Sequence, residues 1–85
     1  MLKYEAQLRE ILSGGGYFTE PIDSVQPDTL FQSAGMDSLK FVQLIIQVED
    51  AFDIEFPEDK MVITQAGTIQ KLCDIIEVQK QENDA

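Results

Sequence analysis

The chain has 85 residues, which corresponds to one small domain, and its 16 acidic and 6 basic side chains give a formal net charge of −10. Such a charge repels phosphate backbones and anionic lipids, so nucleic acids and membrane surfaces are unfavourable partners. Because histidine is absent and Cys73 is the single cysteine, His-based catalysis, the usual zinc sites and an intramolecular disulfide are excluded.

The first segment of the chain predicts a short amphipathic helix over residues 2–13. Its apolar side chains recur at helical spacing, at Tyr4, Leu8, Ile11 and Leu12. The glycine triplet at 14–16 then ends the helix. This segment has no apolar signal-peptide core, and no stretch of the chain approaches the roughly 18 to 20 apolar residues that a membrane span needs. We therefore expect a soluble, reduced, cytoplasmic protein.

A long connection follows between residues 14 and 36. It carries glycines and prolines without a clear hydrophobic period, but it also contains spaced apolar residues, namely Phe18, Ile22, Val25, Leu30 and Phe31. Connections longer than about 12 to 15 residues are uncommon in a compact domain unless they are functional or packed by their own side chains. The spaced apolar residues favour a connection that packs against the domain.

The centre of the chain predicts a second helix over residues 38–52, a run too long for a typical strand. Its apolar residues fill two adjoining stripes: Leu39, Val42, Ile45, Ile46 and Phe52 in one, and Phe41, Leu44 and Val48 in the other. The alternating segment 52–57 contains Pro57 and has no partner strand, so we expect an extended linker there.

The rest of the chain predicts a short helical segment near residues 58–63 and a last main helix after Thr68, its expected N-cap. The apolar residues of that helix follow at helical spacing, at Ile69, Leu72, Cys73 and Ile76. Cys73 is therefore expected in the core rather than as a nucleophile. We expect residues 1–80 to form one domain and residues 81–85 a disordered polar tail.

Ser38 is the most informative polar residue, because it starts the apolar second helix. One interpretation is a helix N-cap, the commonest reason for a serine at this position. The other is attachment of a phosphate-containing group, since the positive end of a helix dipole stabilises a phosphodiester. The residues by themselves leave both interpretations open.

Acidic residues make the centre of the chain electronegative. Seven acids lie between Asp37 and Asp59, and Lys40 is the only base in that interval. They indicate either a solvated face or a docking surface for basic partners. A calcium loop is disfavoured because the D-x-[DN]-x-[DN]-G order and its turn glycine are missing. We expect no metal site and no catalysis by paired carboxylates.

The stretch GMDSL, from Gly35 to Leu39, resembles the G-x-D-S-L signature of acyl carrier proteins and thiolation domains. Further stretches look like the same pattern in the same order: PDTLFQSAG at 27–35, V-x-L-I at 42–45, EDAF at 49–52, DIEFP at 53–57, TI at 68–69 and DII at 74–76. The resemblance covers about residues 25–78. It implies an all-α, small four-helix acyl-carrier-like bundle of the stand-alone type, with three main helices, one short helix and a long first loop.

The resemblance implies that Ser38 accepts 4′-phosphopantetheine from coenzyme A, through a separate phosphopantetheinyl transferase. The terminal thiol of this arm would carry acyl or aminoacyl intermediates as thioesters. The chain would then be a non-catalytic carrier, used by acyl- or aminoacyl-loading enzymes and by synthases and transferases. We expect it to act as a monomer.

The resemblance also implies which surface contacts these enzymes. Asp37 would flank the serine in the transferase interface. The apolar contacts would come from Leu39, Val42 and Ile46, and the charged contacts from Glu49, Asp50 and Asp53. The other stripe of the helix, with Leu44 and Val48, would face the core.

The chain departs from the pattern of primary fatty-acid carriers. Lys40 and Gln43 stand where that type commonly has acids, Ala34 replaces a leucine, and Phe41 replaces a small residue. These departures favour polyketide, nonribosomal-peptide or similar specialised biosynthesis, with fatty-acid biosynthesis as the alternative. A further alternative, from another class, is an acidic protein-interaction module that is never loaded.

Overall fold

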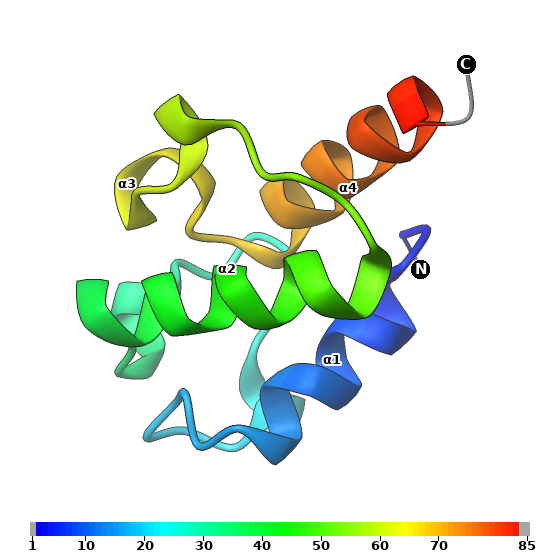
Figure 1. Ribbon diagram of the computed structural model, residues 1–85. Helices are drawn as coiled ribbons and strands as arrows, with labels where there is room; N and C mark the ends of the chain where they lie inside the picture. The colour runs from blue at the N-terminus through cyan, green and yellow to red at the C-terminus, as the bar shows by residue number, and fades with distance from the viewer. Residues whose placement is uncertain (1, 84–85) are drawn as a thin grey trace.

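The computed structural model describes residues 2–83, and the chain folds into a small helical bundle (Figure 1). The α-helices are α1 (Glu5–Gly14), α2 (Ser38–Phe52), α3 (Ile63–Ala66) and α4 (Ile69–Asn83), and the short 3-10 helices are η1 (Ile22–Ser24), η2 (Phe31–Ala34) and η3 (Glu58–Lys60). Between residues 2 and 83 there is no strand. The expected all-α architecture, with three main helices, a short one and a long first loop, is confirmed.

The ends of two helices differ from the expectation. Helix α1 begins at Glu5 rather than at residue 2, because Tyr4 has a left-handed backbone conformation with φ 70°. Helix α4 continues to Asn83, so 81–83 are helical rather than the start of a polar tail. Residues 84 and 85 of the expected tail lie outside the described part of the chain. The short helical segment expected near 58–63 is divided into η3 and α3.

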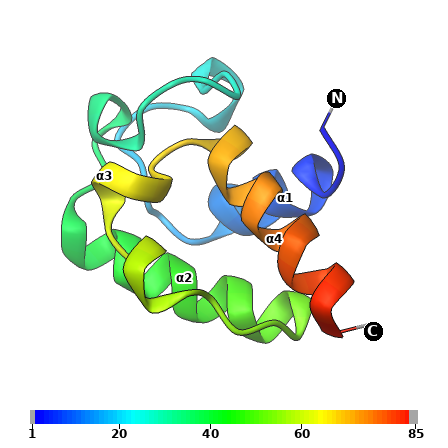
Figure 2. The same cartoon turned by 90° about the horizontal axis from the view of Figure 1, so that it is seen from above.

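One hydrophobic core joins all four helices. In Figure 1, α2 runs across the molecule, with α1 on one side of it and α3 and α4 on the other, and Figure 2 shows the same arrangement from above. The side chains that are 0 % exposed are Leu8, Phe31, Phe41, Leu44, Ile45, Val48, Ala66, Ile69, Leu72 and Ile76. Burial of this apolar surface is the main stabilising contribution in a domain of this size.

The long connection between α1 and α2 packs against the domain, as its spaced apolar residues predicted. Val25 and Phe31 are buried, although Leu30 remains 52 % exposed. The Phe31 N–H donates to the Gly67 carbonyl oxygen at 2.8 Å, and the Gln70 N–H donates to the Pro27 carbonyl oxygen at 3.0 Å. These bonds fix the connection to the turn between α3 and α4 and to the first turn of α4.

The end of this connection sets the start of α2. The Met36 N–H donates to the Phe31 carbonyl oxygen at 3.0 Å, and the Met36 side chain is buried. Between them Gly35 has φ 98°, a value that favours glycine. A Cβ on Gly35 would lie 2.1 Å from Thr19 Oγ1, whose own N–H donates to the Ala34 carbonyl oxygen. These contacts therefore fix the backbone conformation of the residues before Ser38.

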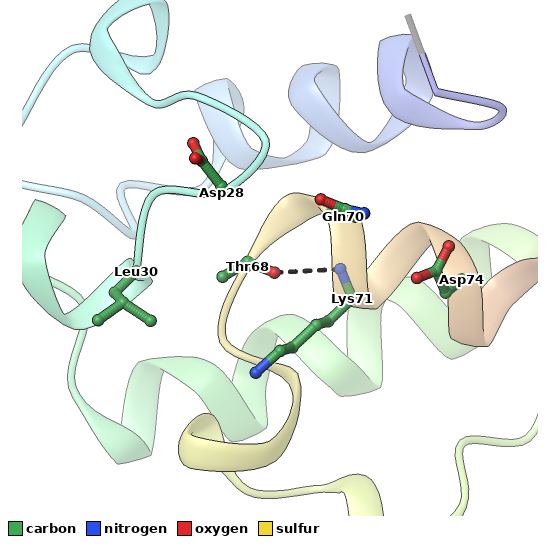
Figure 3. Close-up of a pocket in the computed structure, with 6 residues that line it drawn as sticks. All are labelled: Asp28, Leu30, Thr68, Gln70, Lys71 and Asp74. Carbon is green, nitrogen blue, oxygen red and sulfur yellow. Dashed lines mark hydrogen bonds between the residues drawn. The ribbon is translucent and has the colours of Figure 1, made fainter.

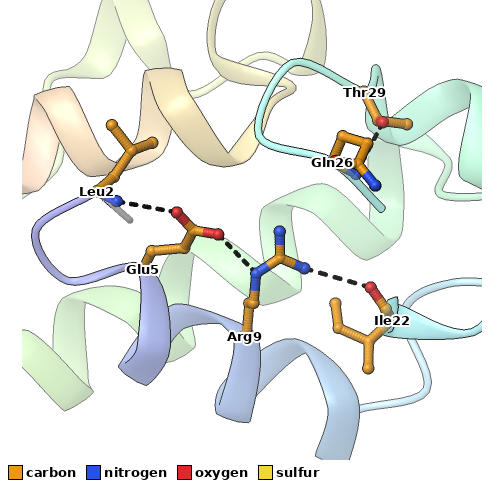
Figure 4. A network of polar contacts seen from close by, with 6 residues as sticks. All are labelled: Leu2, Glu5, Arg9, Ile22, Gln26 and Thr29. Carbon is orange, nitrogen blue, oxygen red and sulfur yellow. Dashed lines mark hydrogen bonds and ion pairs between the residues drawn. The ribbon is translucent and has the colours of Figure 1, made fainter. Parts of the chain in front are cut away.

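A buried carboxylate ties the N-terminal residues to the long connection (Figure 4). Glu5 is 4 % exposed, and its Oε1 accepts a hydrogen bond from the Leu2 N–H at 3.0 Å. Its Oε2 pairs with Arg9 Nε at 2.8 Å, and Arg9 Nη1 donates to the Ile22 carbonyl oxygen at 3.3 Å. The Leu2 N–H and then the Arg9 guanidinium hold the pKa of the Glu5 carboxyl below its ordinary value of 4.5.

We expect Glu5→Gln to lower the free energy of unfolding by about 1 kcal/mol at neutral pH, because a charged acceptor is lost. The pKa of the Glu5 carboxyl is lower in the folded state than in the unfolded chain. The ionised carboxylate therefore stabilises the fold fully above pH 4.5, and this stabilisation is lost as the pH falls through the folded-state pKa. Urea unfolding of the native protein and of Glu5→Gln, measured from neutral pH to below pH 4.5, should show that their difference in unfolding free energy becomes smaller as the pH falls. Glu10→Gln, on the exposed face of the same helix, is the control. An equal effect of both substitutions at neutral pH would contradict this role.

We expect Gly35→Ala to destabilise the fold by roughly 1 to 3 kcal/mol, because the new methyl group meets Thr19 at a positive φ. Gly14→Ala is the matched control, since a Cβ at Gly14 has no neighbour within 4 Å. Alanine is also the better helix former there, so Gly14→Ala should be neutral or slightly stabilising. Thermal and urea unfolding measure both. Similar stability of the two variants would contradict this prediction and show that the turn at Gly35 accommodates a side chain.

Candidate functional site

The candidate site is the N-terminal end of α2. Asp37 is extended and is the N-cap: its Oδ1 accepts a hydrogen bond from the Lys40 N–H at 2.8 Å. Ser38 is the first residue within the helix. The interpretation of Ser38 as the helix cap is therefore wrong, because the aspartate one residue earlier has that role.

The Ser38 side chain is exposed, and no hydrogen bond of its hydroxyl group occurs within residues 2–83. The hydroxyl lies where the first backbone N–H groups of a 15-residue helix lack intrahelical partners. These N–H groups and the positive end of the helix dipole stabilise a negative charge. An exposed serine hydroxyl at such a position fits a phosphodiester without rearrangement of the core.

Helix α2 presents a strip of apolar side chains to solvent next to Ser38. Leu39 is 68 % exposed, Val42 40 % and Ile46 58 %. Leu44 and Val48 are fully buried, as expected. The sequence grouped Ile45 and Phe52 with the exposed strip, but both are buried because they lie at the border that turns toward the core. The expected division of the helix into a core face and a surface face is otherwise observed.

The three acids expected at this surface have different surroundings. Glu49 is only partly exposed, and its Oε2 accepts a hydrogen bond from the Phe56 N–H at 2.8 Å. Its carbonyl oxygen accepts the N–H groups of Asp53 and Ile54, so Glu49 holds the linker after α2. Asp53 ends the helix in a left-handed conformation with φ 54°. Asp50 is exposed on the helix surface.

The sequence did not reveal this structural role of Glu49, because the bond joins a helix side chain to a backbone group in the linker. The alternation in 52–57 indicated an extended segment but not its partner. The Phe56 side chain, whose backbone N–H makes this bond, is buried at 4 % exposure.

A surface hollow of the described residues lies away from this site. Figure 3 shows this hollow of about 460 Å³ between the long connection and the start of α4, lined by Asp28, Leu30, Thr68, Gln70, Lys71 and Asp74. Thr68 Oγ1 accepts a hydrogen bond from the Lys71 N–H at 3.1 Å, which confirms Thr68 as the N-cap of α4. No residue of α2 lines this hollow. Ser38 is thus an exposed residue of the helix end that does not line this hollow.

The cysteine thiol and the potential metal ligands do not form a second candidate site in the described residues. Cys73 is buried in the core as expected, and burial first, then the charge of Glu5, raise the pKa of its thiol to about 11. In the part of the chain that the structure describes, no group of three or more potential metal-ligating side chains is arranged to hold a metal ion. Among the same residues, no helix is both long and apolar enough to cross a membrane.

Comparisons with known proteins agree on the family. The family model described as "Phosphopantetheine attachment site" matches residues 7–76. An aminoacyl carrier protein of Agrobacterium fabrum is 33 % identical over 73 residues, which are 86 % of this chain and 88 % of that protein. A D-alanyl carrier protein of Lactococcus lactis is 32 % identical over 87 % of this chain and 89 % of its own length. An acyl carrier protein of Chlorobium phaeovibrioides is 34 % identical over 64 % of this chain and 68 % of its own length.

Solved structures give the same result. The chain is similar, with a TM-score of 0.78, to a chain in a solved complex. That complex contains an engineered Bradyrhizobium japonicum glycine:[carrier protein] ligase, a carrier protein from Agrobacterium tumefaciens and ATP. The two matched chains are 32 % identical, and the match covers 87 % of this chain and 96 % of the other. Members of such families are modified with phosphopantetheine and used by partner enzymes, and the family match spans most of the helical bundle. The chain therefore belongs to the phosphopantetheine-dependent carrier proteins and is a carrier rather than an enzyme.

Proposed function

We propose that Ser38 is the attachment point of 4′-phosphopantetheine and that the loaded chain carries an aminoacyl group, delivered by an ATP-dependent ligase. The observation that carries this proposal is the exposed, unbonded Ser38 hydroxyl at the N-terminal end of α2. The group, once attached, supplies a terminal thiol for the thioester. The aminoacyl and D-alanyl carrier proteins among the relatives support an aminoacyl cargo.

The chain contributes a hydroxyl group but no base to the modification. Ser38 Oγ forms the new bond to the phosphorus of the pantetheine phosphate of coenzyme A, and the bond to the adenosine bisphosphate leaving group breaks. The hydroxyl proton passes to a base of the transferase, because the chain has no histidine and the adjacent Asp37 carboxylate accepts the Lys40 N–H. Ser38 therefore needs accessibility rather than activation within this protein.

The same helix end supplies the contacts with partner enzymes. The exposed Leu39, Val42 and Ile46 lie beside Ser38 and would enter an apolar surface of a partner. Asp37 flanks the serine, and Asp50 is available to solvent. Glu49 and Asp53 are less suited to a partner role, because Glu49 bonds the linker and Asp53 forms the turn that ends α2.

For the pathway we propose polyketide, nonribosomal-peptide or similar specialised biosynthesis. An aminoacyl cargo is compatible with it, and the departures at Lys40 and Phe41 favour it. Phe41 is fully buried and fills the core side of α2 close to Ser38. Fatty-acid biosynthesis is the second candidate, supported by the similarity to the Chlorobium acyl carrier protein.

Modification of Ser38 can be tested directly. Incubation with coenzyme A, Mg²⁺ and a broad-specificity phosphopantetheinyl transferase should add the mass of one phosphopantetheinyl group to the native protein and none to Ser38→Ala. Ser33→Ala is the matched control, since Ser33 is an exposed serine in the turn before the site, and it should be modified like the native chain. Intact mass spectrometry reads all three. No mass gain, or a gain that persists in Ser38→Ala, would instead support a module that is never loaded at this residue.

A further inference from the structure

One side of α2 carries both Ser38 and Glu49. The eleven positions between them turn the helix by about 1,100°, so the two side chains leave it within about 20° of each other and about 16 Å apart along its axis. Val42 lies on the same side, four residues after Ser38. This side of the helix therefore has the proposed attachment residue near one end and Glu49 near the other.

The chain that follows α2 returns along the helix. We call residues 54–66 the return segment, which contains η3 and α3. In both Figure 1 and Figure 2 it runs back from the C-terminal end of α2, and α3 lies by the first half of that helix. Its apolar anchors are buried, and they are Ile54, Phe56, Ile63 and Ala66. The return segment is thus a second element close to the helix end that carries Ser38.

Glu49 bonds the return segment to α2. Its carbonyl oxygen accepts the Ile54 N–H at 3.1 Å, and its Oε2 accepts the Phe56 N–H at 2.8 Å. Among residues 2–83, these are the hydrogen bonds that join residues 54–66 to other parts of the chain. The next such bond comes at Gly67, just after the segment. The Glu49 carboxylate is therefore the side-chain group that fixes this segment to the helix.

The bond from Glu49 to Phe56 has no substitute nearby in the linker. The Phe56 side chain is 4 % exposed, and without the carboxylate its backbone N–H would lose its acceptor. The contacts of α1 and α4 would remain, because neither helix bonds to residues 54–66. We expect the return segment to open locally before the whole bundle unfolds.

We propose that Glu49 is a positioning residue for the reactions at Ser38, and that it acts through a side-chain oxygen that holds the return segment rather than through a charge that partner enzymes recognise. The inference rests on the proposed attachment at Ser38. A partner that reaches this serine meets α2 and the nearby α3 together, so the bond fixes both parts of the contact surface before the encounter.

Two reciprocal substitutions separate the bond from the charge. Glu49→Asp keeps the charge but shortens the side chain by one methylene group, which withdraws the carboxylate from the Phe56 N–H. Glu49→Gln removes the charge but keeps the length and an acceptor oxygen. Asp50→Asn is the matched control, because it removes the same charge from the adjacent, exposed residue of the helix.

Each variant is measured in two ways. Amide hydrogen exchange followed by NMR reports the protection of the Phe56 N–H and of the other amides in 54–66, with the amides of α1 as the internal reference for global stability. The rate of Ser38 modification by a phosphopantetheinyl transferase, with coenzyme A and Mg²⁺, gives kcat and KM at low and high salt.

We expect Glu49→Asp to speed exchange of the Phe56 N–H about tenfold or more, while the amides of α1 stay close to native, because the lost bond is local. Its kcat/KM for modification should fall about threefold to tenfold at both salt concentrations, since misplacement of the return segment does not depend on screening. Glu49→Gln and Asp50→Asn should stay within about twofold of native in both measurements, because exposed charges contribute little.

The opposite pattern would overturn the proposal. If Glu49→Gln slows modification at low salt while Glu49→Asp matches the native rate, Glu49 is a docking charge. Native exchange at Phe56 in Glu49→Asp would show that the bond does not hold the segment. If the native protein gains no mass, the attachment at Ser38 fails and the positioning role fails with it, whereas the exchange data still report whether Glu49 holds residues 54–66.

Discussion

The position of Ser38, the proposed attachment residue, depends on how Phe31 is held. Its side chain is completely buried and packs against the Phe18 ring with centroids 5.3 Å apart. Its N–H donates to the Gly67 carbonyl oxygen and its carbonyl oxygen accepts the Met36 N–H. One residue thereby joins the turn between α3 and α4 to the residue two positions before Ser38. Because these contacts are in the core, the start of α2 is fixed while its outer surface stays free to meet other proteins.

This separation of a fixed interior and an available surface is what a carrier requires. The chain has little reactive chemistry of its own, since it lacks histidine and its thiol is buried. In the proposed function, its contribution is to present the Ser38 hydroxyl group and one helix face in a constant relation to each other. Partner enzymes would then supply the base, the cargo and the energy of activation, and the small domain would need only enough stability to keep that relation.

Helix α2 and the N-cap Thr68 were predictable from the sequence because each depends on local pattern: a long apolar period in one case and a short polar residue before an apolar helix in the other. Ser38 was predicted to be the attachment residue from a run of motifs in a fixed order. The start of α1 was missed because the left-handed conformation of Tyr4 has no sequence signal. The residues alone left open whether Ser38 caps α2, because serine and aspartate both cap helices, and the structure places the cap at Asp37. The bond from Glu49 to Phe56 depends on how the linker folds back, which periodicity does not describe.

The assignment of the helix cap to Asp37 has a consequence for the proposed modification. The Asp37 carboxylate already uses an N–H group of the first turn of α2, and a phosphodiester on the next residue would add a second negative charge at the same helix end. Both anions would be stabilised by the same few N–H groups and would repel each other. The free energy of the first helical turn would therefore differ between the unmodified and modified forms. Attachment at Ser38 would thus be thermodynamically linked to local helix stability at the proposed partner surface.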